Sequence, residues 1–317
     1  MKQKTCNLMY GLGFFWILFL PLGVTADEMI KYIRVEHLMD IQSDFNQPSE
    51  VAVDNSGKIF ILDGANNRLK IFTPQGKLIR VIGRPGKGNG EFANPMGMDL
   101  DLQGNIYVAD TGNRRIQVFS DTGKFLRKID LARWDSRPVE VGVMKSADRR
   151  IAMPVYVSDA NNHQILCFNT EGSFRFSWGG LGVEKERFQF PGMMAIDPNR
   201  DIYIVDILNG RIQVFNPLGQ GVRQIGEFGI LPGRLFRPKG IVIDKASVVY
   251  VSDSYSGVIQ AFDTGGKLRG ILSAEKDAFL RLTTPMGMAI DPQERLYVVQ
   301  SALNKVSVFR FLDKGAP

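Results

Sequence analysis

Histidine and cysteine are scarce in this sequence, and their scarcity excludes several kinds of site. The 317 residues include two histidines, His37 and His163, and two cysteines, Cys6 and Cys167. We expect His37 in a connecting segment and His163 in a turn, and a catalytic zinc held by three histidines cannot be assembled. Paired-cysteine motifs, phosphate-binding loops before a helix and nucleophile elbows are missing too. The sequence therefore predicts no catalytic residues, no metal ligands and no cofactor.

The N-terminal residues have the pattern of an export signal. Two lysines within the first four residues precede a mostly apolar run, residues 8–24, which is followed by small residues. We expect residues 1–26 to be a signal peptide cleaved after Ala26, because the run is short and contains Pro21. An uncleaved membrane anchor formed by residues 8–24 is the alternative. Both interpretations predict an exported protein, periplasmic or extracellular.

Cleavage would leave a single cysteine and a small positive charge. Cys167 then has no partner for an internal disulfide, so the fold must depend on its apolar core. We expect Cys167 to be buried as a small hydrophobic residue. The remaining 37 Lys and Arg exceed the 33 Asp and Glu only slightly, and without a focused patch this balance does not indicate nucleic-acid binding.

A repeat of about 47 residues runs through the rest of the chain. An aromatic-apolar-x-Asp segment, clearest at Tyr107 to Asp110, recurs with terminal residues at 63, 110, 159, 206, 253 and 300, where Gln300 replaces the aspartate. A phenylalanine stands nine residues after each of these positions, and a proline opens each unit. The sequence therefore contains six copies of one structural unit.

The unit has the pattern of a propeller blade. In residues 92–129, four short apolar segments at 96–101, 106–109, 116–119 and 125–129 are separated by turn-forming residues. The second segments are almost continuously apolar, as expected of strands that are buried on both faces. We predict an all-β, six-bladed β-propeller of four-stranded antiparallel blades, forming one domain over residues 27–317.

The two ends of the chain should meet in the sixth blade. That unit stops after its third strand, and the segment 30–35 has no other partner. We therefore predict that this N-terminal strand completes the last blade and closes the ring, which also hides exposed strand edges. Ser273 to Leu282 is expected to form a short helix capped by Ser273.

Three segments of the second unit resemble the NHL repeat: Phe92 to Gly97, Asn105 to Asp110 and Gly112 to Phe119. The likeness extends over about residues 45–311 and is weakest in units three and six. It implies a six-bladed propeller with a binding role. Similar propellers that act as amidating lyases use a histidine-bound metal, which this chain lacks the histidines to build. Sugar-lactonase propellers use carboxylate and amide ligands at the channel mouth.

Departures from the repeat mark the mouth of the axial channel as a candidate ligand site. Two positions after the opening prolines, Glu50 and Glu140 stand where three sister units have glycine. Because they belong to blades one and three, we expect them to face the mouth without touching. They are solvated, internally paired, or ligands of a cation. Flanking candidates, which pack around the axis or hold a ligand or a soft metal, are Lys239, Met96, Met193 and Met286.

Basic residues in the connections between blades mark a second candidate surface. Arg84, Arg187 and Arg237 lie in the connections that lead into blades two, four and five and should share one face, where they form either a soluble rim or a docking surface. The recurring aspartates, in contrast, are expected to be structural, because the residues of a catalytic site occur once in a protein and do not recur in every blade.

Two functions remain open. The first is an exported, non-enzymatic binding or scaffold protein, a monomeric propeller that presents its loop face to a protein or an extended ligand. It would contact a membrane only through an uncleaved N-terminus. The alternative is a divalent-metal-dependent, lactonase-like hydrolase, which requires Glu50 and Glu140 to converge on one point beside Asn or Asp side chains.

Overall fold

The computed structural model describes residues 31–145, 153–275 and 278–313. The predicted signal peptide, residues 1–26, and the alternative anchor, residues 8–24, lie outside these ranges. Within them, no helix has both the length and the apolar character needed to cross a bilayer.

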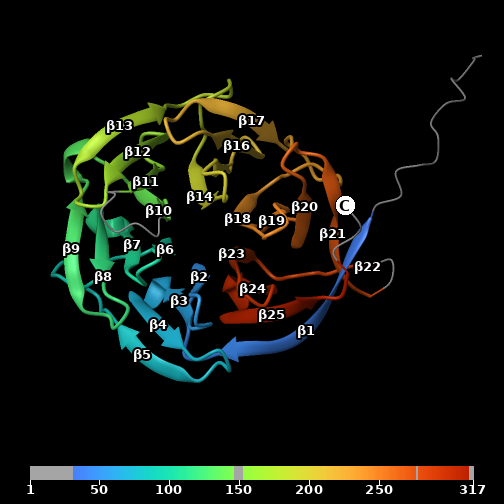
Figure 1. Cartoon of the computed structure of the whole chain (residues 1–317), viewed down its shortest axis with the longest axis horizontal. Coiled ribbons are helices and arrows are strands. Elements are labelled where there is room, and N and C mark those ends of the chain that lie inside the picture. The colour runs from blue at the N-terminus through green and yellow to red at the C-terminus, as the bar shows by residue number, and fades with distance from the viewer. Residues whose placement is uncertain (1–30, 146–152, 276–277, 314–317) are drawn as a thin grey trace, which may run out of the picture.

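The strands form a closed ring of six blades around one axis (Figure 1). The first four blades are separate four-stranded sheets, and strand β1 (Tyr32–Gln42) joins the fifth and sixth blades into one nine-stranded sheet. The pairing inside every blade is antiparallel between neighbours in the chain. The predicted all-β, six-bladed propeller is confirmed.

Within each blade the strands follow one another from the axis to the outer wall. The innermost strands are β2 (Glu50–Val53), β6 (Met98–Leu100), β10 (Pro138–Val143), β14 (Pro191–Ile196), β18 (Pro238–Ile243) and β23 (Pro285–Ile290). The second strands are β3 (Ile59–Asp63), β7 (Ile106–Asp110), β11 (Pro154–Asp159), β15 (Ile202–Asp206), β19 (Val249–Asp253) and β24 (Arg295–Gln300). The third strands are β4 (Arg68–Phe72), β8 (Arg115–Phe119), β12 (Gln164–Asn169), β16 (Arg211–Phe215), β20 (Val258–Phe262) and β25 (Lys305–Phe311).

The fourth strands form the outer wall. They are β5 (Leu78–Ile82), β9 (Phe125–Asp130), β13 (Phe174–Gly179), β17 (Gly221–Ile225) and β21 (Leu268–Glu275), with β1 in the sixth blade. A two-residue strand pairs with β21, and four 3-10 turns complete the elements: β22 (Ala278–Phe279), η1 (Gly64–Asn66), η2 (Thr111–Asn113), η3 (Ala132–Trp134) and η4 (Ser301–Leu303).

The core consists of the apolar layers between neighbouring blades. All residues of the second strands β3, β7, β15 and β19 are buried, because each strand is covered on both faces. The repeated phenylalanines belong to these layers, as Phe119 does between blades one and two, where its ring lies 5.7 Å from that of Phe92. Loss of such a side chain costs about 3–5 kcal/mol. No blade can bury its faces alone, so the fold requires the closed ring.

The repeated aspartate has a structural role, because its hydrogen bonds join two segments of the blade. Asp110 is fully buried and accepts hydrogen bonds from the Ala93 backbone N–H at 2.8 Å and from Arg115 Nε at 2.7 Å. It thereby ties the connection that leads into its blade to the third strand. In blade six, Gln300 takes this place, and its side-chain oxygen accepts a hydrogen bond from the Thr283 backbone N–H at 2.9 Å. The sixth unit therefore keeps this hydrogen bond to the connection, with an amide in place of the carboxylate.

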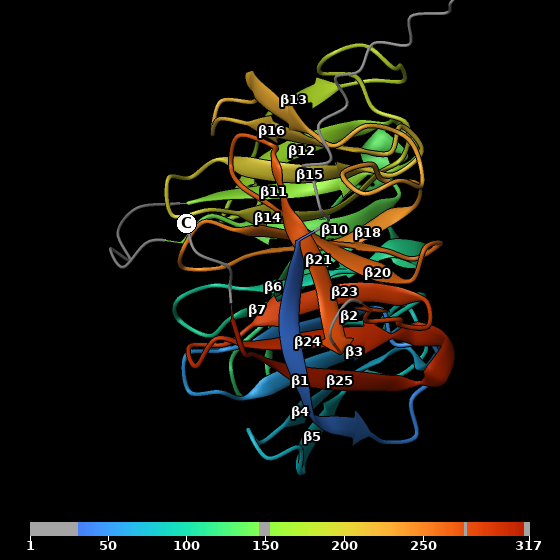
Figure 2. The same cartoon turned by 90° about the vertical axis from the view of Figure 1, so that its right-hand side faces the viewer.

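Strand β1 latches the ring (Figure 2). Val35–Gln42 pair antiparallel with β25 and complete the sixth blade, while Tyr32–Arg34 pair parallel with β21 of the fifth. Ile33 and Val35 enter the core between blades five and six, and Ile41 enters the core between blades six and one. The latch is confirmed, with a correction to its range: the sequence placed it at 30–35, but the extended segment continues past His37, which lies inside the strand.

The predicted helix at Ser273 to Leu282 is wrong. β21 continues through Ser273, and β22 folds back onto it, with Ser273 opposite Phe279. The Phe279 ring lies 5.5 Å from that of Tyr32 on the latch strand. Pairing with the latch and with β21 therefore overrides the local preference for a helix.

Candidate ligand-binding sites along the axis

The two faces of the ring carry different segments. The inter-blade connections and the turns after the second strands lie on one face, called here the loop face. The turns between strands one and two, and between strands three and four, lie on the opposite face. Three connections share one geometry, with parallel bridges that join Pro85 to Phe92, Leu181 to Phe188, and Phe228 to Leu235.

The three predicted arginines lie on separate connections of the loop face and do not converge. Arg84 is exposed and forms an ion pair with Glu91 at 2.8 Å. Arg187 is exposed and donates a hydrogen bond to the Gly179 carbonyl oxygen at 2.7 Å. Arg237 is half-buried, with its guanidinium 5.1 Å from the centre of the Phe236 ring. These residues surround the axis and do not form one compact site.

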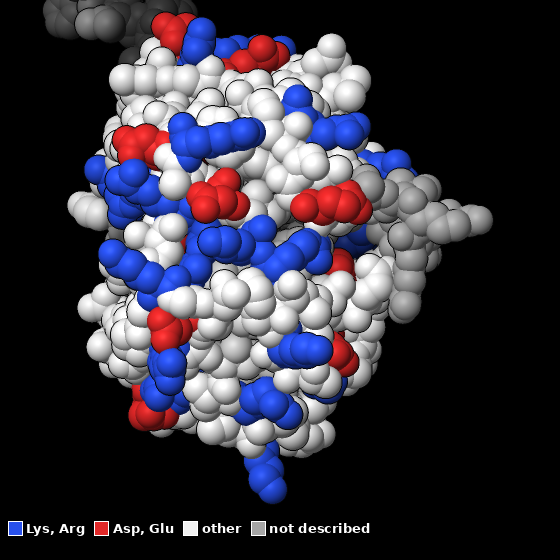
Figure 3. Space-filling view, turned by 90° about the vertical axis from the view of Figure 1, so that its left-hand side faces the viewer, with Lys and Arg blue, Asp and Glu red and all other residues white. Residues whose placement is uncertain are grey.

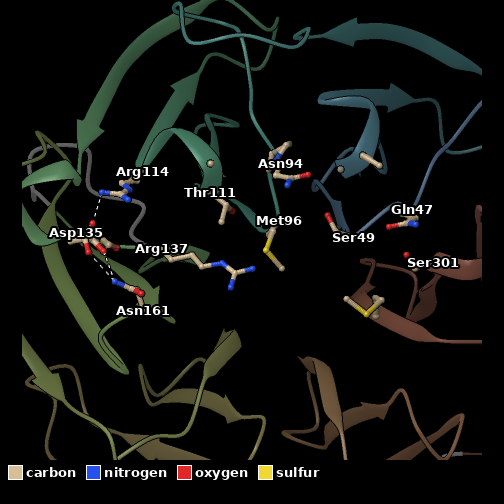
Figure 4. Close-up of a pocket in the computed structure, with 16 residues that line it drawn as sticks. Gln47, Ser49, Asn94, Met96, Thr111, Arg114, Asp135, Arg137, Asn161 and Ser301 are labelled. Carbon is tan, nitrogen blue, oxygen red and sulfur yellow. Dashed lines mark hydrogen bonds and ion pairs between the residues drawn. The ribbon is translucent and has the colours of Figure 1, made fainter.

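A cavity of about 550 Å³ opens at the axis on the loop face (Figure 4). Its lining comes mainly from blades one, two and three, and it includes the predicted Met96 and Met286. Arg114 and Asp135 form an ion pair at one side, and Asn161 donates a hydrogen bond to the Asp135 carbonyl oxygen at 2.8 Å. The only carboxylate in the described lining is therefore already engaged.

Arg137 is the free charged group of this cavity. Its side chain is exposed and reaches from blade three toward the centre, facing Met96 (Figure 4). Its guanidinium lies 5.5 Å from the centre of the Phe190 ring, and it makes no ion pair within the described ranges. Ser49 and Ser136 also line the cavity, and their buried hydroxyls have no hydrogen-bond partner in the described structure.

Glu50 and Glu140 meet inside the axial channel, which corrects the expectation that they would not touch. Both are buried, and their carboxyl groups are hydrogen-bonded to each other. A Cβ at Gly287 would lie 2.2 Å from a Glu50 oxygen, and one at Gly97 would lie 2.5 Å from a Glu140 oxygen. The glycines of blades six and two therefore provide the space into which the glutamates fold.

Burial makes this carboxyl pair hold its protons. Loss of solvent raises the pKa of Glu50 to about 8. Burial and then the charge of Glu50 hold the pKa of Glu140 well above its usual range. Each carboxyl also accepts a hydrogen bond from the next backbone N–H, at 3.1 Å from Val51 and at 2.8 Å from Val141. At neutral pH the pair is mainly protonated and compensates little positive charge nearby.

A second cavity of about 550 Å³ extends from the carboxyl pair to the opposite face. Its wall is largely aliphatic and includes the predicted Met193. Asp99 contributes a carboxylate that accepts a hydrogen bond from the Val143 backbone N–H at 2.9 Å and lies 3.5 Å from Lys145 Nζ. Charged residues such as Lys145, Arg200 and Lys245 also line this channel, and the structure pairs Asp99 with its own neighbours.

Lys239, the remaining predicted residue, is half-buried at the second position of β18 and lines neither cavity. Burial lowers its pKa, and the nearby positive charge of Arg237 lowers it further. Lys239 makes no ion pair with any residue of the described structure. The Asp253 carboxylate acts on this pKa in the opposite direction without forming an ion pair. Among the described residues, Arg137, Arg237 and Lys239 thus form no ion pair at the axial end of the loop face.

Positive charge is not confined to the loop face. The outer wall in Figure 3 also has more Lys and Arg than Asp and Glu. Exposed residues of blades two and three that contribute to this charge include Lys124, Lys128 and Arg175. Net charge alone therefore does not single out a binding surface.

The sequence interpretation missed Arg137. It stands at the end of the connection into blade three, directly before Pro138, as Gln47 and Asn94 stand before their own prolines. In that connection η3 replaces the glycine-rich segment found before blade two, and Trp134 packs against Phe168 with ring centres 5.4 Å apart. Gln47, Asn94 and Arg137 all line the cavity, so the position before the opening proline is what brings Arg137 to the axis.

Comparisons with known proteins support the fold. A family described as a 6-bladed beta-propeller matches residues 28–142. No curated protein matches the sequence significantly. Virginiamycin B lyase from Staphylococcus aureus is a similar solved structure, with 16% identity, a TM-score of 0.61, and coverage of 86% of this chain and 84% of that chain.

Two further structures give the same result. A gluconolactonase from Xanthomonas campestris has 14% identity and a TM-score of 0.63, with 86% of this chain and 88% of that chain covered. A protein of unknown function from Bacteroides thetaiotaomicron has 12% identity and a TM-score of 0.65, with 87% and 75% covered. At these identities the likeness extends to the propeller fold and not to an activity.

Proposed function

We propose that this chain is an exported, non-enzymatic binding or scaffold protein, an NHL-type propeller that presents its loop face to a protein or an extended ligand. The observation that carries the proposal is the loop-face cavity. Among the described residues, Arg137 lines it without an ion-pair partner, and the buried hydroxyls of Ser49 and Ser136 line it without a hydrogen-bond partner. Leaving a buried hydroxyl unpaired costs free energy that a ligand would recover.

The rim of the same face supports the proposal. Apolar side chains of the inter-blade connections and turns stand exposed over blades four and five, where a folded protein gains nothing from them unless they contact a partner. Phe236 packs between Phe228 and Tyr255, with ring centres 5.1 and 4.5 Å away. The exposed members of this apolar rim are Leu181, Val183, Leu208, Phe228, Ile230, Leu231 and Tyr255.

The two histidines and the cysteine of the described chain line neither cavity. His37 Nε2 lies 2.9 Å from Asp40 on the latch strand. His163 Nδ1 accepts a hydrogen bond from the Phe190 backbone N–H at 3.0 Å, which fixes a connection. Burial raises the pKa of the Cys167 thiol to about 12, so it is not a nucleophile at neutral pH. These roles favour binding over catalysis.

The alternative, a divalent-metal-dependent lactonase-like hydrolase, has the convergence of Glu50 and Glu140 in its favour. The described residues hold no group of three or more His, Cys, Asp or Glu placed to bind a metal ion, whereas Ca²⁺ typically takes about six to eight oxygen ligands. Hydrolysis of a lactone panel with and without Ca²⁺ tests this alternative. A metal-dependent rate that disappears in Glu50→Gln would establish it and overturn the binding proposal.

Site-specific photocrosslinking tests the binding proposal. A benzoylphenylalanine at Asn94 lies on the loop face beside the cavity, and one at Asn55 lies in an exposed turn of the opposite face. In cells that produce the protein, we expect a discrete adduct from position 94 and none from position 55. The same adduct from both positions, or from position 55 alone, would contradict the proposal.

A further inference from the structure

The residues that directly precede the opening prolines form the inner rim of the loop face. This rim contains two arginines and no carboxylate. Its members are Gln47, Asn94, Arg137, Phe190, Arg237 and Thr284. Lys239 stands two positions after Arg237 and adds a third cation. None of these three cations forms an ion pair within the described ranges. The nearest carboxylates, Asp159 and Asp253, accept hydrogen bonds from the backbone N–H groups of Arg137 and Arg237, so the three side chains remain without a direct carboxylate contact.

The backbone around Arg137 is fixed from both sides. Its backbone N–H donates to Asp159 Oδ1 at 2.9 Å, and its carbonyl oxygen accepts from the Ala160 N–H at 3.0 Å. Contact with the Phe190 ring holds the guanidinium from the side. An arginine that is positioned before a ligand arrives loses less conformational entropy on binding.

Two neighbouring features increase the attraction of this rim for anions. The carboxyl pair below it is mainly protonated at neutral pH and so leaves the cations uncompensated. Arg114, the other cation that lines the cavity, is already paired with Asp135. The Arg137 guanidinium is therefore the one in this lining that has no ion-pair partner among the described residues. A planar guanidinium fork matches two oxygens of a carboxylate or a phosphate.

We propose that the loop-face cavity is an oxyanion site, in which Arg137 binds a carboxylate or phosphate group of the ligand. The inference rests on the proposed function, because it names the chemistry that the loop face recognises. Arg237 and Lys239 strengthen the field at the mouth, and the hydroxyls of Ser49 and Ser136 are further donors at the edge of the cavity. Arg137 makes the direct contact.

Calorimetric titration of the purified protein at low ionic strength tests the site. The probes are succinate, its neutral counterpart succinamide, and inorganic phosphate. We expect one or both anions to bind and succinamide not to bind. Preference for succinate would identify a carboxylate ligand, and preference for phosphate would identify a phosphorylated one. Failure of both anions to bind, or equal binding of succinate and succinamide, would overturn the proposal.

Matched variants locate the contact. Arg137→Gln should weaken anion binding at least about tenfold, because it removes a charge-assisted bidentate contact, and Arg137→Lys should retain part of the affinity. Arg133→Gln is the control, since it removes the same charge four residues away, where Arg133 stacks on Trp134 at 3.7 Å. Equal weakening by the Arg137→Gln and Arg133→Gln variants would contradict the assignment. Thermal unfolding confirms that each variant is folded.

The photocrosslink at position 94 separates this inference from the proposed function. If the adduct forms equally in Arg137→Gln and neither anion binds, the oxyanion site is wrong and the loop-face function stands. If no adduct forms from the loop face while succinate or phosphate still binds through Arg137, the proposed function fails and the oxyanion site stands.

Discussion

Replacement of the buried carboxyl pair by amides should remove a large part of the pH dependence of stability. In the folded protein burial raises the pKa of Glu50 from 4.5 to about 8. Between these values the unfolded chain has lost the proton that the folded chain keeps. Unfolding therefore releases a proton, and the free energy of unfolding falls as the pH rises from about 4.5 to 8.

The magnitude follows from the same shift. At about 1.4 kcal/mol per pKa unit, Glu50 alone lowers the free energy of unfolding by roughly 3–4 kcal/mol between pH 5 and pH 8. Glu140 acts in the same direction. Glutamine has the shape of a protonated glutamate and does not titrate. The double variant Glu50→Gln/Glu140→Gln should resemble the natural protein at pH 5 and exceed its stability at pH 8.

Urea unfolding followed by tryptophan fluorescence at pH 5, 6.5 and 8 provides the measurement. Glu171→Gln is the control, because Glu171 is an exposed glutamate on a turn of blade three. The control should keep the full pH dependence. If the double variant and the natural protein lose the same free energy between pH 5 and pH 8, the carboxyl pair does not hold its protons and the reasoning is refuted.

Three further predictions test the packing around the axis and the ring. Gly287→Ala should destabilise the protein by about 1–3 kcal/mol, because its Cβ would meet the Glu50 carboxyl. In a double-mutant cycle measured by urea unfolding, Glu50→Ala in the same chain should relieve this cost, and no relief would contradict the contact. Val35→Asp should detach strand β1, since it places a charge in the core between blades five and six. The rate of backbone amide hydrogen exchange should then increase first in β25 and β21. An equal increase in all blades would contradict the role of β1 as a latch. Cys167 should resist a thiol reagent at pH 8 until urea unfolds the chain, because the thiol is buried with a raised pKa; rapid labelling of the folded protein would contradict its burial.

The fold was predictable because its signals repeat. A buried strand and the phenylalanine nine residues after its end recur six times, and the strand ends on aspartate in five units, so an error in one unit is corrected by the others. Boundaries that depend on contacts distant in the sequence were less predictable. The latch extends to Gln42, and Ser273 lies in a strand, because residues from opposite ends of the chain pair there.

The candidate site was harder to predict, because it depends on departures from the repeat. Glu50 and Glu140 stood out as departures, but their contact depends on the empty space above Gly97 and Gly287, which only the radial packing of the blades shows. Arg137 was missed because arginine is common in this chain. What distinguishes it is the lack of a carboxylate partner, which is a property of three-dimensional structure.

A comparison of equal charge losses on the two faces tests the central claim most directly. Arg137→Gln/Lys239→Gln removes two cations from the loop face, and Lys145→Gln/Lys245→Gln removes two from the mouth of the opposite channel. The yield of the loop-face photocrosslink is measured in both variants. Binding through the loop face predicts that the first variant loses the adduct and the second keeps it. Loss in the second variant with retention in the first would contradict the account.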